Sequence, residues 1–410
     1  MALRALPPPR WDLVVESFSE AAFLWSRWDQ ALDSPQHTLD GVVHWVEERL
    51  LGALDGVRLG GDDAVRKLLV PALSGRRARR ATAAAYLLAS GGPETAKHVV
   101  DAFETVAPRR LAFLRRGIEC SLGSHGLRAL CDALPRLGPE AQAVALDALA
   151  FRRFPLPPGL DASLRRDAPA VQRSGLRLSA AMREPWCDAY IEWGLQQTDP
   201  ALQVEATYAG TLRGRRGAAD RAYELVSRRW PGADALLPLC GLAHGNRLLP
   251  VLQARVADGE ATREVFDALA SIGTVEAADV CAAALDNPEQ SRLAADALRA
   301  ITSIDPRPGP GDPRDEDAPR DQLLLPVPSV DGVRRAWAAT RSDYRGGHRY
   351  FEGKPFTPEA LGAALRTSSM RRRTLLASEL MLRTGGARHV TTKTWTAVQR
   401  AQLRGLPAQA

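Results

Sequence analysis

Apolar residues recur along most of the chain at the spacing of an amphipathic helix. One series runs from Ala141 to Leu149 and another from Ala294 to Ile301, both in steps of i, i+3, i+4 and i+7. This spacing places the apolar side chains on one face of a helix. Each series therefore predicts a helix with a single stripe of side chains to bury.

The helical segments repeat along the chain. Comparable units begin with Asp or Gly in a turn and continue into an Ala/Leu-rich helix, 28 to 32 residues apart, with one gap of 59 residues that spans a degenerate unit. A period near 30 accommodates two antiparallel helices, and stacked pairs bury the stripes that one pair cannot. The pattern predicts an all-α fold, an α-solenoid of antiparallel helix pairs. The units begin near Gly138, Asp167, Asp199, Asp258 and Asp286.

Several helix starts are marked by their residue types. Pro93, Pro139 and Pro200 stand where the first turn of a helix tolerates proline. Asp286, with Glu289 three residues later, fits a capping box and predicts a helix that begins there.

The two ends of the chain differ from the middle, which predicts four parts. Residues 1–60 form an N-terminal helical capping unit, and residues 61–304 form the solenoid. Residues 305–330 are rich in Pro, Gly and acidic residues and predict a linker. Residues 331–410 form a small C-terminal helical unit, in which Thr357 to Glu359 start one helix and two more follow near 369–384 and 394–403.

Composition narrows the class of protein. The 410 residues are 45% hydrophobic, 25% charged and 6% aromatic, which is typical of a globular, helix-rich chain and not of an all-β sandwich. No apolar run reaches the 18 residues of a spanning helix, and no secretory leader is visible. We therefore expect a cytoplasmic protein that does not enter a membrane.

The net charge of +6 is weak evidence for a nucleic-acid partner. Only four of the 54 basic residues are Lys. Such an Arg bias, together with abundant Ala, Gly and Pro, is typical of a GC-rich genome. We favour the interpretation that the positive charge reflects this codon usage over the alternative that it marks a phosphate-binding surface.

No known catalytic or cofactor motif is present, so we expect neither a catalytic residue nor a cofactor. The five cysteines contain no CxxC pair. Cys240 and His244 are four residues apart, but a zinc site needs three or four ligands. We expect small buried thiols in a reducing compartment and no metal.

Two groups of residues are candidates for binding a protein partner. Trp25, Trp28 and Trp45 crowd the N-terminal end, where they either close the end of the solenoid or form an aromatic binding face. The loop sequence RGGHRYFEGKP offers a basic, aromatic surface for an anionic group or a peptide; alternatively, Tyr350 and Phe351 anchor it while its charges are solvated. Its candidate residues are His348, Arg349, Tyr350 and Lys354.

The repeats resemble short HEAT repeats. Asp or Gly stands in the turn, Arg173 and Arg292 follow it by six residues in two units, and Val144 and Glu205 replace the Arg in others. Over nearly the full length, SEAAFLWSRWDQAL, HWVEERLLGALDGVRLGG, HRYFEGKP, RRRTLLASELMLRTGG and WTAVQRAQL resemble a family of bacterial HEAT-repeat proteins often encoded near type VI secretion genes. The family has no assigned activity. The resemblance implies a non-enzymatic scaffold or adaptor that binds a protein partner, such as a secretion effector or chaperone.

The alternative is a DNA-binding protein of the HEAT-like alkylated-base glycosylase type. It requires the Arg clusters to align on one concave face as a positive stripe. Such enzymes also need aromatics and a carboxylate, for which Trp186, Trp193, Trp230 and Asp188 are candidates. The clusters are Arg76, Arg77, Arg79 and Arg80; Arg213, Arg215 and Arg216; and Arg371, Arg372 and Arg373. A lyase or modifying enzyme built on HEAT repeats is a third hypothesis, without a residue set to support it.

Overall fold

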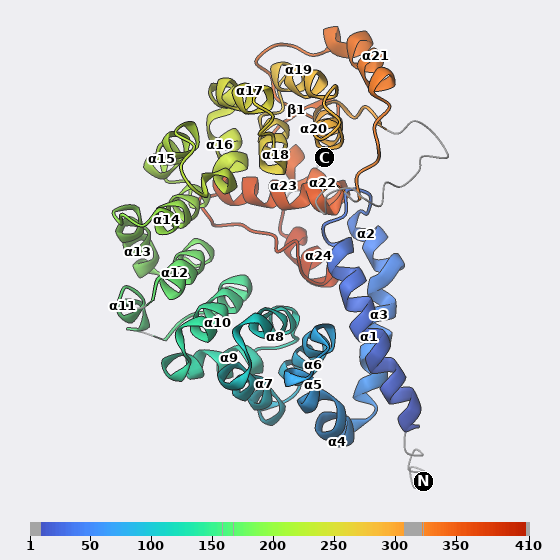
Figure 1. The fold of residues 1–410 in the computed structure, drawn as a ribbon, viewed down its shortest axis with the longest axis vertical. Coiled ribbons are helices and arrows are strands. Elements are labelled where there is room, and N and C mark those ends of the chain that lie inside the picture. Colours follow the sequence, from blue (N-terminus) through green and yellow to red (C-terminus); the bar gives the residue numbers. More distant parts are fainter. Residues whose placement is uncertain (1–9, 158, 167, 307–321, 323, 407–410) are drawn as a thin grey trace. The chain divides into compact units, whose positions relative to one another are not determined.

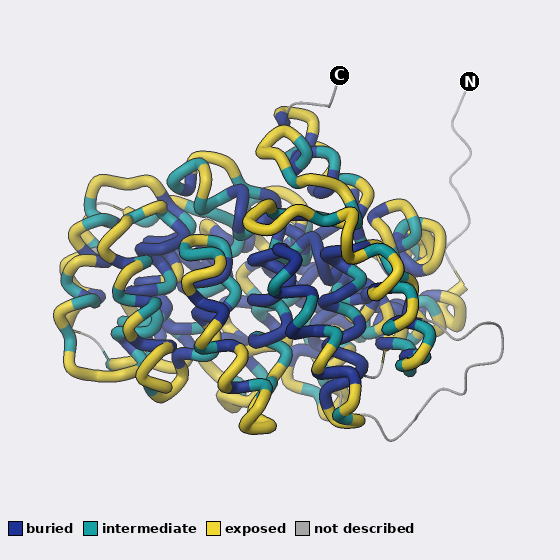
Figure 2. The backbone as a smooth tube through the Cα atoms, turned by 90° about the horizontal axis from the view of Figure 1, so that it is seen from above, coloured by how far each residue is buried: buried dark blue, intermediate teal, exposed yellow. Residues whose placement is uncertain are grey.

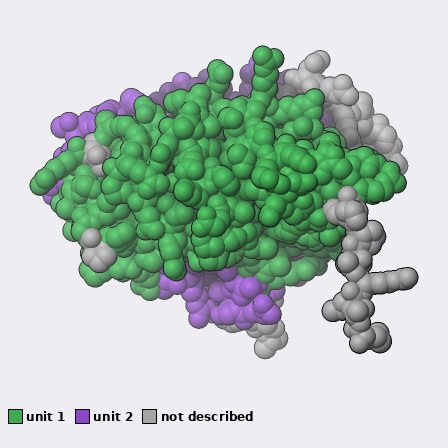
Figure 3. Space-filling model, turned by 90° about the horizontal axis from the view of Figure 1, so that it is seen from below, with its two compact units in different colours: residues 1–33, 39–190, 393–400 green, residues 34–38, 191–392, 401–410 purple. Residues whose placement is uncertain are grey.

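The computed structural model describes residues 10–157, 159–166, 168–306, 322 and 324–406. Helix makes up 73% of the chain and the two strands have two residues each, so the predicted all-α class is confirmed. The chain forms two compact units, coloured separately in Figure 3. Unit 1 comprises residues 1–33, 39–190 and 393–400, and unit 2 comprises residues 34–38, 191–392 and 401–410.

Unit 1 is built from helices that pack in rows (Figure 1). In the first row, each of α6 (Ala78–Ser90), α8 (Pro108–Cys120), α10 (Pro139–Arg152) and α12 (Pro169–Ala181) packs against the next. α7 (Pro93–Thr105) and α9 (His125–Ala133) pack beside it. The remaining segments are α1 (Trp11–Ala31), α2 (Leu39–Val42), the π-helix η1 (Val43–Glu47), α3 (Glu48–Arg58), α4 (Gly61–Ala64), the π-helix η2 (Val65–Leu69), α5 (Val70–Ser74), the 3₁₀-helix η3 (Leu134–Arg136), α11 (Leu160–Leu164) and the first half of α13 (Pro185–Leu195).

Unit 2 repeats this arrangement. Its first row is α14 (Pro200–Leu212), α16 (Leu237–His244), α18 (Arg263–Ile272) and α20 (Ser291–Thr302). α15 (Arg216–Ser227), α17 (Leu249–Ala257) and α19 (Val275–Ala284) flank that row. The remaining segments are the second half of α13, the 3₁₀-helices η4 (Ala233–Leu236), η5 (Gly245–Leu248) and η6 (Arg341–Asp343), helices α21 (Val330–Thr340), α22 (Ala360–Thr367) and α23 (Met370–Arg383), and strands β1 (Tyr350–Phe351) and β2 (Lys354–Pro355). Helix α24 (Thr396–Arg404) belongs to unit 1 up to residue 400 and to unit 2 from residue 401.

The paired rows confirm the predicted α-solenoid, and Figure 2 shows buried residues running through the successive helices. Pro93, Pro139 and Pro200 each occupy the first turn of a helix, as predicted. The prediction that Asp286 starts a helix with a capping box is wrong, because α20 begins only at Ser291. Asp286 instead pairs with Arg334, which takes its carboxylate away from the helix start.

The division of the chain differs from the predicted four parts. The main boundary, between residues 190 and 191, falls inside the predicted solenoid, and residues 393–400 belong to unit 1. Of the predicted linker 305–330, residues 307–321 and 323 lie outside the described residues. Residues 393–400 belong to unit 1 because Trp395 and Thr396 pack into its core, and local sequence patterns do not reveal so distant a contact.

Trp395 ties the C-terminal segment into the core of unit 1. Its ring stacks on Trp28 with centroids 4.4 Å apart and meets Trp25 edge-on at 5.8 Å. Its indole Nε1 donates to the carbonyl oxygen of Cys120, 2.7 Å away, so the buried N–H is satisfied. Trp25 and Trp28 are 2% and 0% exposed. These tryptophans close the core at the first helices, one of the two predicted alternatives.

A buried carboxylate lies beside this aromatic cluster. Glu47, 3% exposed, accepts hydrogen bonds from Trp28 Nε1 at 2.7 Å and from the backbone N–H and hydroxyl of Thr396. Burial raises the pKa of Glu47 above its ordinary range, although these donors lower it. The carboxylate thus links α1, the end of η1 and the start of α24.

In unit 2, α23 runs across the first row. It packs on α14 and α16, and Arg372 near its start reaches Asp296 of α20 at 2.7 Å. The β1–β2 hairpin covers the ends of two row helices, because Tyr350 N–H donates to Gly273 O and Gly353 N–H donates to Ile301 O. Gly353 has φ +78°, and a Cβ there would meet Thr302 O at 2.9 Å, so the turn requires glycine. This face of the row is therefore covered by the chain itself.

One described stretch, Ala233–Ala257, has the length and mean hydropathy of a membrane-spanning helix. The secondary structure divides it into η4, α16, η5 and α17. Residues from all four segments belong to one buried core cluster of unit 2, and core helices of a compact unit meet the same criteria.

We predict that Trp395→Ala lowers the free energy of unfolding of unit 1 by about 3–5 kcal/mol, the usual cost of truncating a buried tryptophan. Urea denaturation of the full chain, followed by circular dichroism, measures it. The control is Trp45→Ala, at a position that is 40% exposed, which should cost less than about 1 kcal/mol. Equal losses for the two variants would contradict the role of Trp395.

Glu47 also predicts a pH dependence. Because its pKa is raised above the reference value of 4.5, the unfolded chain loses this proton at lower pH than the folded chain does. The free energy of unfolding should therefore fall as pH rises from 4.5 to the raised value, and level off above it. Glu47→Gln should remove this fall in a series of urea titrations across that range, whereas the exposed Glu16→Gln should keep it.

Candidate functional site

The outer surface of the first helices carries most of the exposed apolar side chains. Ten large apolar residues are exposed in the described part of the chain, and six of them lie between Trp11 and Leu59. Phe23 is 56% exposed and Trp45 is 40% exposed. Exposed apolar side chains gathered on one surface are typical of a protein-binding site. We call the outer surface of α1, η1 and α3 around Phe23 and Trp45 the α1–α3 face; the exposed apolar residues of this part of the chain are Trp11, Leu13, Phe23, Trp45, Leu51 and Leu59.

The helical spacing of α1 explains this surface. Residues 14, 18, 21, 25 and 28 point inward and are buried, while residues 13, 16, 20, 23 and 27 form an outward stripe. Two contacts join the stripe to η1 and α3. The Glu20 carboxylate lies 3.1 Å from the Arg49 guanidinium, and the Arg27 guanidinium lies 5.0 Å from the centre of the Trp45 ring. Phe23 lies between Glu20 and Arg27 on the stripe, so Phe23 and Trp45 share one surface.

The predicted tryptophan site is thus divided between core and surface. Trp25 and Trp28 are buried against Trp395 and are not accessible to a partner. Trp45 is exposed. Phe23 was not among the sequence candidates; its signal was an aromatic residue on the polar stripe of an otherwise regular amphipathic helix.

The predicted loop site is also divided. His348 and Lys354 are exposed. Tyr350 is 5% exposed and its hydroxyl accepts from the Arg345 N–H, which agrees with the alternative that the loop is anchored by its aromatic residues. Arg349 turns toward the buried Glu379.

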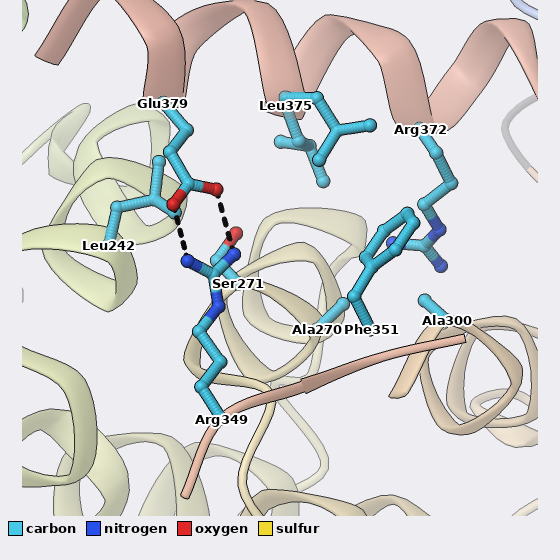
Figure 4. A pocket seen from close by; sticks show the side chains of 10 residues that line it. Leu242, Ala270, Ser271, Ala300, Arg349, Phe351, Arg372, Leu375 and Glu379 are labelled. Atoms are coloured by element: carbon cyan, nitrogen blue, oxygen red, sulfur yellow. Dashed lines mark hydrogen bonds and ion pairs between the residues drawn. The ribbon is translucent and has the colours of Figure 1, made fainter. Parts of the chain in front are cut away.

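Arg349 and Glu379 form a paired cluster between the hairpin and α23 (Figure 4). Nη1 and Nη2 of Arg349 both donate to the Glu379 carboxylate, Nη2 at 2.8 Å, and Arg383 Nε donates to it at 2.7 Å. The adjacent cavity measures about 20 Å³, which is room for one water molecule. The cluster therefore holds α23 to the hairpin and leaves no space for a substrate.

The Arg clusters of unit 2 do not form an exposed stripe in the described structure. Arg371, Arg372 and Arg373 are buried along α23. Arg215 pairs with Glu192; Arg213 is half-buried, and Arg216 is exposed. Of the glycosylase candidates, Trp186 and Asp188 belong to unit 1 and Trp193 and Trp230 to unit 2, and all four are half-buried.

In unit 1, Arg80 donates to the Ser19 hydroxyl at 2.7 Å and its guanidinium lies over Phe18. The exposed members of that cluster are Arg76, Arg77 and Arg79, at the start of α6.

The cysteines are all buried and free, as predicted. Burial raises the pKa of Cys240 to about 12 and that of Cys131 to about 11, so both thiols stay protonated and unreactive at neutral pH. His244 Nε2 lies 2.8 Å from the Ala219 carbonyl oxygen. The described residues contain no group of three His, Cys, Asp or Glu placed to hold a metal ion.

Comparison with known proteins gives no family. No family model matches the chain, and no curated protein does. One matching solved structure is an engineered protein determined by the Northeast Structural Genomics Consortium, with 16% sequence identity over 90% of this chain and 100% of that chain. Its TM-score of 0.30 is too low to support an inference about fold or function.

We predict that Glu379→Ala lowers the free energy of unfolding of unit 2 by about 3–5 kcal/mol, because it leaves Arg349 partly buried without its carboxylate. Urea denaturation of the full chain measures the change. The exposed Glu359→Ala serves as the control and should change stability by less than about 0.5 kcal/mol. If both variants unfold alike, the cluster does not hold α23 in place.

Proposed function

We propose that this protein is a non-enzymatic scaffold or adaptor that binds a protein partner through the α1–α3 face. The observation that supports the proposal is that six of the ten exposed large apolar side chains of the described residues lie between Trp11 and Leu59, with Phe23 and Trp45 on one surface. An amphipathic helix is the partner element that best fits a surface formed by two packed helices. Phe23 and Trp45 are the anchors, since exposed aromatic residues dominate the energy of such contacts.

The charged side chains of the α1–α3 face indicate which residues the partner carries. Arg49 is paired with Glu20, whereas the Arg27 guanidinium lies over the Trp45 ring and has no carboxylate partner among the described residues. A partner helix with apolar side chains and an acidic residue beside them complements this surface. The resemblance to bacterial HEAT-repeat proteins encoded near type VI secretion genes makes an effector or chaperone of such a system the first partner to test.

The test compares surface variants in a pull-down. Immobilised full-length protein is incubated with nuclease-treated lysate of the source organism, washed at low and high salt, and bound proteins are identified by mass spectrometry. The variants are Phe23→Ser with Trp45→Ala, and the control Leu122→Ser, at an exposed position between α8 and α9. We expect a partner retained by the wild type and the control, with affinity reduced about 30-fold or more in the double variant.

Three results would contradict the proposal. The first is equal retention of every partner by all three proteins. The second is recovery of nucleic acid alone in an untreated lysate. The third is failure to recover any partner from this lysate. Thermal melts of the variants establish that loss of binding is not loss of folding.

A further inference from the structure

A hollow of about 850 Å³ lies in unit 1 where α6 and α8 begin. Its volume is within the range of small-molecule sites. Ser74, Arg76, Thr105, Arg109, Arg110 and Phe113 line it, and its lining includes no acidic residue. Three arginines therefore surround a concave surface that no carboxylate of the lining neutralises.

Arg109 and Arg110 occupy an electrostatically unfavourable position, near the positive end of a helix dipole. α6 and α8 are each 13 residues long, and neither has an acidic residue in its first turn. Arg109 and Arg110 instead stand in the first turn of α8, where the partial charge of the helix is already positive. By contrast, α7 and α10 begin with Glu94 and Glu140. An anion at this place relieves the repulsion.

Arg110 gives separate evidence. Its Nε and Nη2 atoms are buried and have no acceptor among the described residues. Later in the same helix, Arg115 pairs with Asp147 at 3.0 Å and Arg116 with Asp29 at 2.7 Å. Carboxylates of α10 and α1 thus pair with the half-buried Arg115 and Arg116, whereas no acidic residue lines the hollow at Arg110. Buried N–H groups without an acceptor are costly, and an oxyanion in the hollow is the acceptor that Nε and Nη2 of the half-buried Arg110 lack.

We propose that this hollow binds a small phosphorylated molecule. Arg76, Arg109 and Arg110 hold the phosphoryl oxygens, and Phe113, 36% exposed at the edge, packs against an aromatic or apolar part of the same ligand. Arginine suits this role because its planar guanidinium matches phosphate geometry. The site does not depend on the α1–α3 face.

The surroundings favour a compact anion over a duplex. A duplex needs cations spaced along its backbone. The next helix of the row, α10, begins with Glu140, and the nearby Arg136 lies 2.5 Å from Glu104. The uncompensated positive charge therefore ends at the hollow instead of continuing along the row.

The test is calorimetric titration of the full-length protein with sodium pyrophosphate, ADP and a short DNA duplex, at roughly 50 and 200 mM salt. We expect pyrophosphate and ADP to bind with Kd below about 1 mM. Arg110→Gln should weaken both by about 10-fold or more. Arg76→Gln, at an exposed position, should act in the same direction and covers the case in which Arg110→Gln perturbs folding. Arg128→Gln, an exposed arginine on α9, is the matched control and should bind as the wild type does.

Phe113→Ala tests the apolar part of the site. ADP should bind more tightly than pyrophosphate, and this variant should remove the difference. Equal affinities for the two ligands in the wild type overturn the role of Phe113. The phosphate site itself is overturned if neither ligand binds at about 1 mM, if Arg128→Gln weakens binding as much as Arg110→Gln, or if only the duplex binds, with the steep salt dependence of a phosphate-backbone contact.

Discussion

Each helix of about 13 residues in this chain has one apolar stripe that it cannot bury by itself. Packing the next helix against that stripe buries it. The helices at the two ends of a row have a neighbour on one side only, so their apolar stripes remain exposed unless another part of the chain covers them. The structure closes these ends with large residues and with segments taken from elsewhere in the chain. The stack of Trp28 and Trp395 is the clearest example, since it buries two indoles that are far apart in the sequence.

The features that were predictable from sequence are local. The 3.6-residue period and the first-turn prolines depend on neighbours within a few residues, so they indicate the helices of both rows. Asp199 illustrates this: its carboxylate accepts from Leu202 N–H at 2.8 Å and caps α14. Asp286 shows the limit, because its ion pair with the distant Arg334 competes with a capping role that the local sequence favours.

Charge is where sequence reasoning was weakest. The run from Arg371 to Arg373 has the composition of a solvated surface, yet Arg373 is fully buried and Arg372 meets Asp296 of α20. The acidic partners stand on helices whose own patterns assign them to solvent. Arg109 and Arg110 have a similar composition and remain at a hollow, because no acidic residue lines it. Only the fold distinguishes an arginine that is buried against an acidic partner from one that lines a hollow without such a partner.

The membership of residues 393–400 in unit 1 has a consequence for biosynthesis. The ribosome releases the chain from its N-terminus, so α1 to α12 emerge long before Trp395 is made. Until then, the indoles of Trp25 and Trp28 lack the ring that covers them. Unit 1 therefore stays incomplete while residues 191–392 are being made, although most of its own residues come first in the chain. A chain that stops before residue 393 lacks the segment that covers Trp25 and Trp28 in unit 1.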